Sequence, residues 1–178
     1  LSAVLALIGS YLGARTALVV SASFLNYLLI ILIPLITVLT LFSKNLGFSD
    51  RAHLLRLGYR LLLGGLAGLI VGFYDGFFGP GTGTFLILIY SSLLHYQFIR
   101  ANGNTKVVNL ASNIAAVITF AVAGKIYYPI AIPAALCGIA GNLLGSRMVV
   151  LRGNKLIKQV FILALILLLG RVLYNVLY

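Results

Sequence analysis

Residues 72–84 read Gly-Phe-Tyr-Asp-Gly-Phe-Phe-Gly-Pro-Gly-Thr-Gly-Thr and interrupt a long apolar run. Five glycines and one proline in so short a stretch cannot sustain an ordinary helix. Pro80 lacks a backbone N–H and disfavours a helical conformation in the residue before it. We therefore predict that one helix ends here and that a second, short helix begins near Thr82. The alternative is that the glycines only allow neighbouring helices to approach closely.

Several apolar runs of the chain are long enough to cross a bilayer, for which about 20 residues are needed. Lipid offers no partner to backbone polar groups, so only helices and closed barrels cross it, and these continuous runs lack the alternation of barrel strands. We predict an all-α fold, a polytopic transmembrane helical bundle with one broken or short helix pair. The seven expected helical pieces are Leu1–Leu12, Phe24–Phe42, Tyr59–Phe78, Thr82–Leu94, Val107–Ala123, Pro129–Val149 and Leu156–Leu177.

The composition excludes an ordinary soluble domain. Of the 178 residues, 62% are hydrophobic and only 8% are charged, whereas a soluble domain carries about 25% charged residues. The net charge is +11, from thirteen Lys and Arg against two acids. The cations cluster in residues 43–60, 100–106 and 147–158, which predicts that these connections face the cytoplasm and that the turn at Lys125 faces outward. No basic face with interleaved aromatic residues is present, so we expect no nucleic-acid partner.

A repeated heptapeptide suggests an internal duplication. The sequence of residues 9–15, GSYLGAR, recurs as GNLLGSR in residues 141–147, a shift of 132 (141 minus 9). Five predicted crossings separate the copies, which would give an inverted repeat of the kind found in secondary transporters; chance similarity of Gly- and Leu-rich helices is the alternative. We predict residues 1–57 as the tail of a first repeat plus a cytoplasmic loop, and 58–178 as the second repeat. We expect the rest of the first repeat upstream of Leu1.

The predicted break would present backbone groups that suit an anion. A helix N-terminus carries free N–H groups and a partial positive charge, and the N–H groups of Gly81, Thr82 and Gly83 would open the second helix. A nucleotide-binding loop is excluded because its Lys-Ser/Thr ending is absent. We predict that the break contributes substrate-binding residues, namely Tyr74, Asp75, Gly79, Pro80, Gly81, Thr82 and Gly83.

Asp75 is the one acid inside an apolar run. An ionisable group within the bilayer is costly and is a functional candidate by default. The carboxyl group could pair with a cation, carry a coupling proton or bind the broken backbone. The alternative is a purely structural cap near a helix end.

A second polar stretch begins at Asn104-Thr105-Lys106 and continues through Asn109 and Asn113. At helical spacing, Lys106, Asn109 and Asn113 share one face, with Thr105 and Ser112 nearby. This pattern predicts a polar path or binding site along one helix. The alternatives are hydrogen bonds between helices for the amide and hydroxyl groups and an interfacial position for the Lys106 ammonium group.

The remaining reactive residue types point to no catalytic or metal site. An intramembrane enzyme would need paired carboxylates, a metal motif or a nucleophile beside a base, and we expect no catalytic residue, metal or cofactor. Cys137 has no partner for an internal disulfide, and His53 and His95 lie in polar connections. Arg15 and Arg147 are expected to end their helices as interfacial anchors.

Residues 72–83, together with Asn104-Thr105-Lys106, Asn109, Ser112-Asn113 and Gly124-Lys125, resemble the TauE/SafE family of sulfite exporters, and in particular its YfcA-like members. The likeness extends through 141–147 and covers most of the chain from about residue 58. It implies a multi-pass carrier of small anions, often sulfur oxyanions or organosulfonates, in the bacterial or archaeal inner membrane.

The leading hypothesis is therefore a secondary transporter of small anions that works by alternating access at the broken helix. The alternatives are a membrane-embedded half-transporter or scaffold subunit, and an anion channel. The expected partners are a small anionic substrate and the lipid bilayer, and the sequence leaves a homo-oligomer open.

Overall fold

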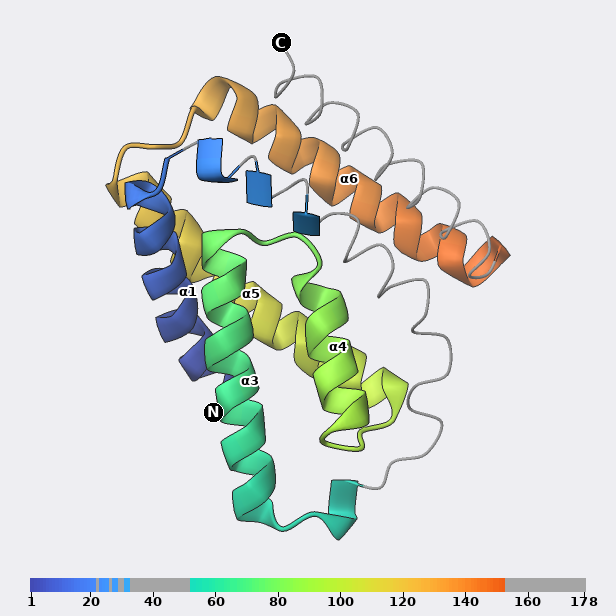
Figure 1. Cartoon of the computed structure of the whole chain (residues 1–178). Coiled ribbons are helices and arrows are strands. Elements are labelled where there is room, and N and C mark those ends of the chain that lie inside the picture. Colours follow the sequence, from blue (N-terminus) through green and yellow to red (C-terminus); the bar gives the residue numbers. More distant parts are fainter. Residues whose placement is uncertain (22, 26, 29–30, 33–51, 153–178) are drawn as a thin grey trace.

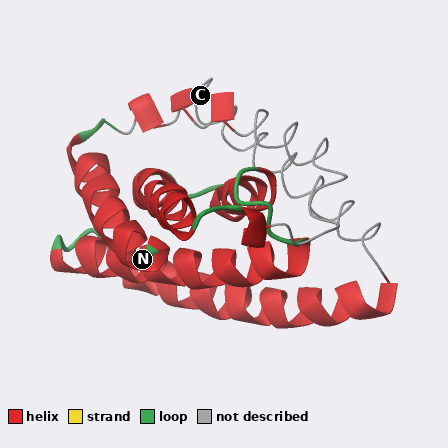
Figure 2. Cartoon of the chain, turned by 90° about the horizontal axis from the view of Figure 1, so that it is seen from below, coloured by secondary structure: helices red, strands yellow, loops and turns green. Residues whose placement is uncertain are grey.

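The computed structural model describes residues 1–21, 23–25, 27–28, 31–32 and 52–152, with backbone only for 145–152. The predicted run Leu156–Leu177, most of Phe24–Phe42 and the cations Lys44, Arg51, Lys155 and Lys158 lie outside these residues. Every regular element in the described part is a helix (Figure 2). The all-α prediction is confirmed.

Four α-helices pack together: α1 (Ser2–Val19), α3 (Leu57–Phe77), α4 (Thr82–Ser92) and α5 (Phe98–Val122). A 3-10 turn, η1 (Ala52–Leu54), precedes α3. The helices α1, α3 and α5 are long and apolar enough to cross a membrane. In Figure 1, α6 (Tyr128–Arg152) runs obliquely across the upper part of the view, and most of its side chains up to Leu144 are exposed.

The contact between α1 and α3 is built from small residues at four-residue spacing. Ser2, Ala6 and Ser10 of α1 lie against Gly68, Gly72 and Gly76 of α3 in the same order, so the two helices run parallel. A Cβ atom at Gly76 would lie 2.0 Å from the carbonyl oxygen of Ser10. Backbones this close require glycine, as in small-residue contacts between membrane helices. For Gly72 and Gly76, the close-packing alternative of the sequence analysis is therefore the right one.

The helices α3 and α4 form a hairpin whose tip lies partway along the bundle. α3 rises to the tip in Figure 1, and the shorter α4 runs back from it toward the end at which α3 began. Ser10, in the middle of α1, and Ser112, just past the middle of α5, lie beside the last turn of α3. With 11 residues, α4 is only about 16 Å long and cannot cross a core of about 30 Å. The predicted break thus lies level with the middle of a spanning helix.

Two predicted helix boundaries are wrong. α5 begins at Phe98, so Arg100 and Lys106 lie within a helix and do not flank a connection. The first half of α5 is helical although its sequence contains many polar side chains, which are typical of a loop. α1 continues past Arg15 to Val19. The Arg15 side chain lies along this helix, where its Nε donates to the Tyr11 hydroxyl at 3.2 Å.

The remaining boundaries agree within a few residues. α3, α4 and α6 match the predicted pieces 59–78, 82–94 and 129–149 closely, except that α6 continues past Arg147 to Arg152. The division into residues 1–57 and 58–178 stays a prediction. Within the described part, α1 of the first segment packs on α3 and α5 of the second.

Candidate functional site

The break itself is made by two glycines and the proline between them. Gly79 has a φ of +91° and Gly81 a φ of +85°, values in the left-handed region that favours glycine. Gly81 is the N-cap of α4, and the first bond of that helix runs from the Phe85 N–H to the Gly81 carbonyl oxygen at 3.1 Å. The sequence prediction of a break is confirmed, and its position is residues 78–81.

The first turn of α4 lies against α5. The Thr82 N–H, which we expected to be available to an anion, donates instead to the Gly79 carbonyl oxygen at 3.3 Å. The N–H groups of Gly83 and Thr84 belong to the first turn of α4, where no intrahelical acceptor exists. At Gly83 a Cβ atom would lie 3.9 Å from Thr105 Cγ2 and 4.0 Å from Asn109 Nδ2. The predicted residues Gly83, Thr105 and Asn109 therefore meet.

Aromatic contacts hold the turn from outside. The Tyr74 hydroxyl donates to the Pro80 carbonyl oxygen at 2.6 Å, across the break. Its ring meets the Phe85 ring edge-on at 5.3 Å between centroids. Tyr74 and Pro80, both predicted site residues, thus position the backbone of the turn.

Asp75 joins three helices through hydroxyl groups. Its Oδ1 lies 2.7 Å from Thr82 Oγ1 at the start of α4, and its Oδ2 accepts a hydrogen bond from Ser112 Oγ of α5. The Ser10 hydroxyl of α1 donates to the Ser112 carbonyl oxygen at 2.6 Å. Within the described residues, no ion pair to Asp75 is present, so the carboxyl group is held by neutral donors.

The hydroxyl groups of Thr82 and Ser112 face more hydrogen-bond acceptors than they have protons to donate. Thr82 Oγ1 also lies 2.6 Å from the Gly79 carbonyl oxygen, and Ser112 Oγ lies 2.9 Å from that of Asn109. Each hydroxyl has one proton to donate, and each faces a carbonyl oxygen and a carboxylate oxygen. A proton on Asp75 would let one hydroxyl accept from the carboxyl group and donate to its carbonyl.

The polar stretch of α5 is only partly brought to the break. Thr105 is 4% exposed, and its hydroxyl has no hydrogen-bond partner among the described residues. The Asn113 amide donates to the carbonyl and side-chain oxygens of Asn109. Asn104 and Lys106 are exposed, and no described contact joins the Lys106 ammonium group to the break. Lys106 nevertheless follows Thr105 directly on the same helix.

Sequence reasoning missed Ser10 and gave Ser112 no role of its own. The signals were weak: Ser10 lies between Gly9 and Gly13 on the small-residue face of α1, and Ser112 is one turn beyond Asn109. The part of the chain that the structure describes contains no group of His, Cys, Asp or Glu side chains that could hold a metal ion.

Comparisons with known proteins give the family. The sequence profile of "Sulfite exporter TauE/SafE" matches residues 1–172. The chain is 33% identical over 168 residues to a "Probable membrane transporter protein" of Haemophilus influenzae, which covers 94% of this chain and 65% of that protein. It is 32% identical over 168 residues to the "Probable membrane transporter protein YfcA" of Escherichia coli K12, covering 94% and 61%. A third relative, "Probable membrane transporter protein ORF9" of Sinorhizobium sp., is 31% identical over 166 residues, covering 93% and 62%.

The chain thus spans less than two thirds of the length of these relatives. No solved structure matches it significantly. The relatives carry the names of membrane transporters, and three described helices are long and apolar enough to span a bilayer. The chain is a multi-pass membrane protein that belongs to the sulfite exporter TauE/SafE family.

Proposed function

We propose that this protein is a secondary transporter of small anions in the cell inner membrane, with sulfite, other sulfur oxyanions and organosulfonates as substrates. The observation that carries the proposal is the tip of the α3–α4 hairpin, which lies beside the middle of α5. There a Cβ atom at Gly83, in the first turn of α4, would lie 3.9 Å from the Thr105 methyl carbon and 4.0 Å from the Asn109 amide nitrogen. The buried hydroxyl of the same Thr105 has no hydrogen-bond partner among the described residues. Helix N-termini and neutral donors of this kind bind anions without requiring a buried cation.

In this mechanism the anion lies against the first turn of α4. The N–H of Gly83 and the Thr105 hydroxyl donate to it, and the Asn109 amide reaches it from the next turn of α5. Lys106 raises the local concentration of anions from its exposed position beside Thr105. The two repeats then move against each other, so that the site opens alternately to each side.

Asp75 is the proposed site of the coupling proton. Its carboxyl group touches Thr82 at the start of α4 and Ser112 of α5, so a change in its charge alters contacts on both sides of the anion site. A protonated carboxyl group adds the donor that the hydroxyl cluster lacks, whereas a carboxylate repels a neighbouring anion. Anion and proton would therefore bind together.

Uptake by proteoliposomes tests this function. The purified protein is reconstituted into liposomes, and the uptake of radiolabelled sulfite is followed with and without a pH gradient. A carrier gives flux that saturates with sulfite concentration and rises when the gradient is applied. Flux that neither saturates nor responds to the gradient would indicate a channel, and no flux above empty liposomes would contradict the proposal.

Matched substitutions then locate the site. Asn109→Leu should reduce sulfite uptake at least about tenfold, since a charge-assisted hydrogen bond contributes roughly 1.5–3 kcal/mol. Leu110→Ala, which keeps an apolar side chain at an exposed position one residue along α5, is the control and should leave uptake within about twofold of the parent. Equal uptake by both variants would remove the hairpin tip from the transport pathway.

A further inference from the structure

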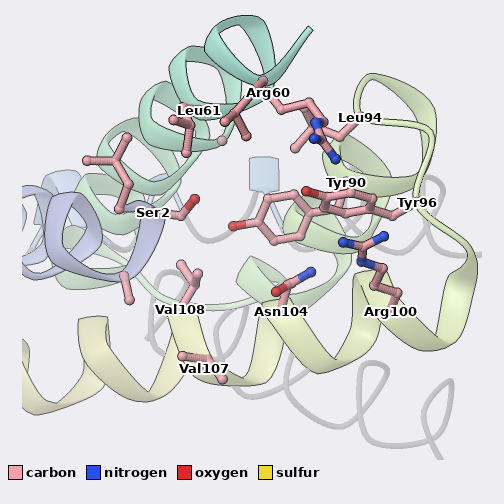
Figure 3. A pocket seen from close by; sticks show the side chains of 14 residues that line it. Ser2, Arg60, Leu61, Tyr90, Leu94, Tyr96, Arg100, Asn104, Val107 and Val108 are labelled. Atoms are coloured by element: carbon pink, nitrogen blue, oxygen red, sulfur yellow. The ribbon is translucent and has the colours of Figure 1, made fainter. Parts of the chain in front are cut away.

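A cavity of about 440 Å³ lies at the base of the hairpin, at the opposite end of α3 from the break. It is bounded by the first turns of α3 and α5, the last turn of α4 and the start of α1. Arg60 lies 15 residues before Asp75, about 22 Å along α3. Along α3 the cavity is therefore distant from the hairpin tip, whereas α5 passes both. Figure 3 shows its polar side chains, which are Ser2, Arg60, Tyr90, Tyr96, Arg100 and Asn104.

Arg60 brings an unsatisfied donor to this cavity. Its Nε atom is buried and has no hydrogen-bond partner among the described residues. A guanidinium group carries only donors and cannot lose its charge in a protein, so burying one of its N–H groups without an acceptor costs free energy. An anion in the cavity would supply the missing acceptor.

Tyr90 and Tyr96 form part of the cavity wall together with Arg60. Tyr90 is 2% exposed, and its hydroxyl lies near Ser2 but makes no hydrogen bond of ordinary geometry with a described residue. The Tyr96 ring lies 6.1 Å from the Tyr90 ring, and the Arg100 guanidinium carbon lies 4.6 Å from the Tyr96 ring centroid. The Tyr90 hydroxyl is thus a second buried donor at the same cavity.

The rest of the lining is apolar. Leu61, Leu94, Val107 and Val108 contribute hydrocarbon surface to the same space, and Figure 3 shows Leu94 and Val108 on either side of the tyrosine rings. The volume falls within the range of small-molecule pockets, which combine mostly apolar walls with a few converging polar groups. A bare inorganic anion would leave these apolar walls without a partner.

We propose that this cavity binds a small organic anion, whose acidic head accepts hydrogen bonds from Arg60 and Tyr90 and whose short apolar tail packs on Leu94 and Val108. Asn104 lines the cavity, and the next residue, Thr105, lies against Gly83 at the hairpin tip. The cavity is thus the first substrate site on the path to the tip. The role in transport rests on the proposed function, but binding is measured without transport.

Calorimetric titration of the detergent-purified protein tests the site. The probes are 1-butanesulfonate and sulfate, which share the oxyanion head but differ in the tail. The variant Arg60→Ala is compared with Arg56→Ala, which also removes one positive charge but lies at an exposed position outside the cavity. We expect Arg60→Ala to weaken 1-butanesulfonate binding at least about tenfold, since hydrogen bonds to charged groups contribute roughly 1.5–3 kcal/mol. Arg56→Ala should change it less than about twofold.

Tyr90→Phe provides a second variant that keeps the ring and removes only the hydroxyl. It should weaken 1-butanesulfonate measurably, and the parent protein should bind 1-butanesulfonate more tightly than sulfate. Equal binding by the Arg60→Ala and Arg56→Ala variants, or equal affinity for the two probes, would overturn the proposal. Loss of 1-butanesulfonate binding on adding phosphatidylglycerol at micellar concentration would also overturn it, because the occupant would then be a lipid headgroup. Arg60-dependent binding without any flux in liposomes would contradict the transport function and leave the binding site standing.

Discussion

At the scale of single residues, Asp75 is the most informative side chain of the molecule. It lies one turn before the break, and its two oxygens contact Thr82 of α4 and Ser112 of α5. Both roles considered from the sequence, the structural cap and the functional carboxyl group, use these same contacts. A substitution that keeps the contacts and removes the charge separates them.

Asp75→Asn is that substitution. The amide has nearly the same shape and can still hydrogen-bond Thr82 and Ser112, but it cannot exchange a proton. We expect uptake driven by a pH gradient to fall at least about tenfold, because the amide cannot carry the coupling proton. Exchange of labelled for unlabelled sulfite across the membrane should stay within about threefold of the parent, because it requires no proton coupling. Gradient-driven uptake equal to that of the parent would assign Asp75 a structural role alone.

Gly79 tests the backbone of the break. Its φ of +91° costs an L-residue about 1–2 kcal/mol, whereas the space around it is sufficient, since a Cβ atom would lie 3.4 Å from the nearest atom. Gly79→Ala should therefore lower the thermal unfolding temperature, measured by circular dichroism in detergent. Gly103→Ala, within α5 with open space around it, should leave that temperature unchanged or raise it. An unfolding temperature of Gly79→Ala equal to that of the parent would mean that the break does not require a left-handed backbone at position 79.

At the scale of elements, the parallel pair α1–α3 fixes the position of the hairpin tip. Gly9 and Gly13 of α1 and Gly68, Gly72 and Gly76 of α3 bring the two backbones into contact. In a bilayer, where apolar side chains gain little by leaving lipid, such close contact supplies much of the association energy. The Ser10 hydroxyl then ties α1 to α5 at the level of the break.

Gly76→Ala should disrupt this pair. The added Cβ would lie 2.0 Å from the Ser10 carbonyl oxygen, and overpacking at a backbone contact costs about 1–3 kcal/mol or more. We expect a lower yield of monodisperse protein in size-exclusion chromatography and a lower unfolding temperature. Gly58→Ala, which meets nothing within 4 Å, is the matched control. Equal behaviour of the two variants would mean that α1 and α3 are not in close contact in the membrane.

Much of this arrangement could be predicted from the sequence, because composition and apolar run length determine where helices form in lipid. The break could also be predicted, since Pro80 and two glycines needing positive φ leave the backbone little choice. The role of each glycine could not be predicted. Gly76 and Gly79 lie only three residues apart, but Gly76 allows close packing against Ser10 of α1, whereas Gly79 adopts a positive φ in the turn. The start of α5 could not be predicted either, because the Asn and Thr side chains there are typical of a loop. The cavity could not be predicted because Arg60 and Tyr90 lie on different helices, 30 residues apart in the sequence.

At the scale of the whole molecule, the predicted repeat places a second small-residue face on α6. The α1 residues that contact α3, namely Ser2, Ala6, Gly9, Ser10 and Gly13, correspond at the shift of 132 to Ala134, Gly138, Gly141, Asn142 and Gly145. All five counterparts are small or polar. This agreement supports the proposed duplication, in which residues 58–178 form the second repeat.

The hairpin makes a prediction about sidedness. Both of its ends lie at the base of the bundle in Figure 1, and the turn after α5 lies at the other end. In a Cys137→Ser background, Leu54→Cys and His95→Cys should react with a membrane-impermeant maleimide from the cytoplasmic side, and Lys125→Cys from the opposite side. Labelling of positions 54 and 95 from opposite sides would mean that α3 and α4 do not form a hairpin that returns to the side on which α3 begins.

Substrate protection at the hairpin tip tests whether the anion binds where α4 begins beside α5. The reporter is Gly83→Cys in the Cys137→Ser background, which keeps the backbone N–H of position 83 and the Asn109 amide, and whose Cβ atom would lie 3.9 Å from Thr105 and 4.0 Å from Asn109. It is alkylated in detergent with and without saturating 1-butanesulfonate, and Gly103→Cys on α5 is the control. We predict that 1-butanesulfonate slows alkylation of position 83 at least about fivefold, as expected for a site that is mostly occupied at saturation, and leaves position 103 unchanged. Equal rates at position 83 with and without the anion, in a protein that still carries sulfite across liposomes, would contradict this binding site.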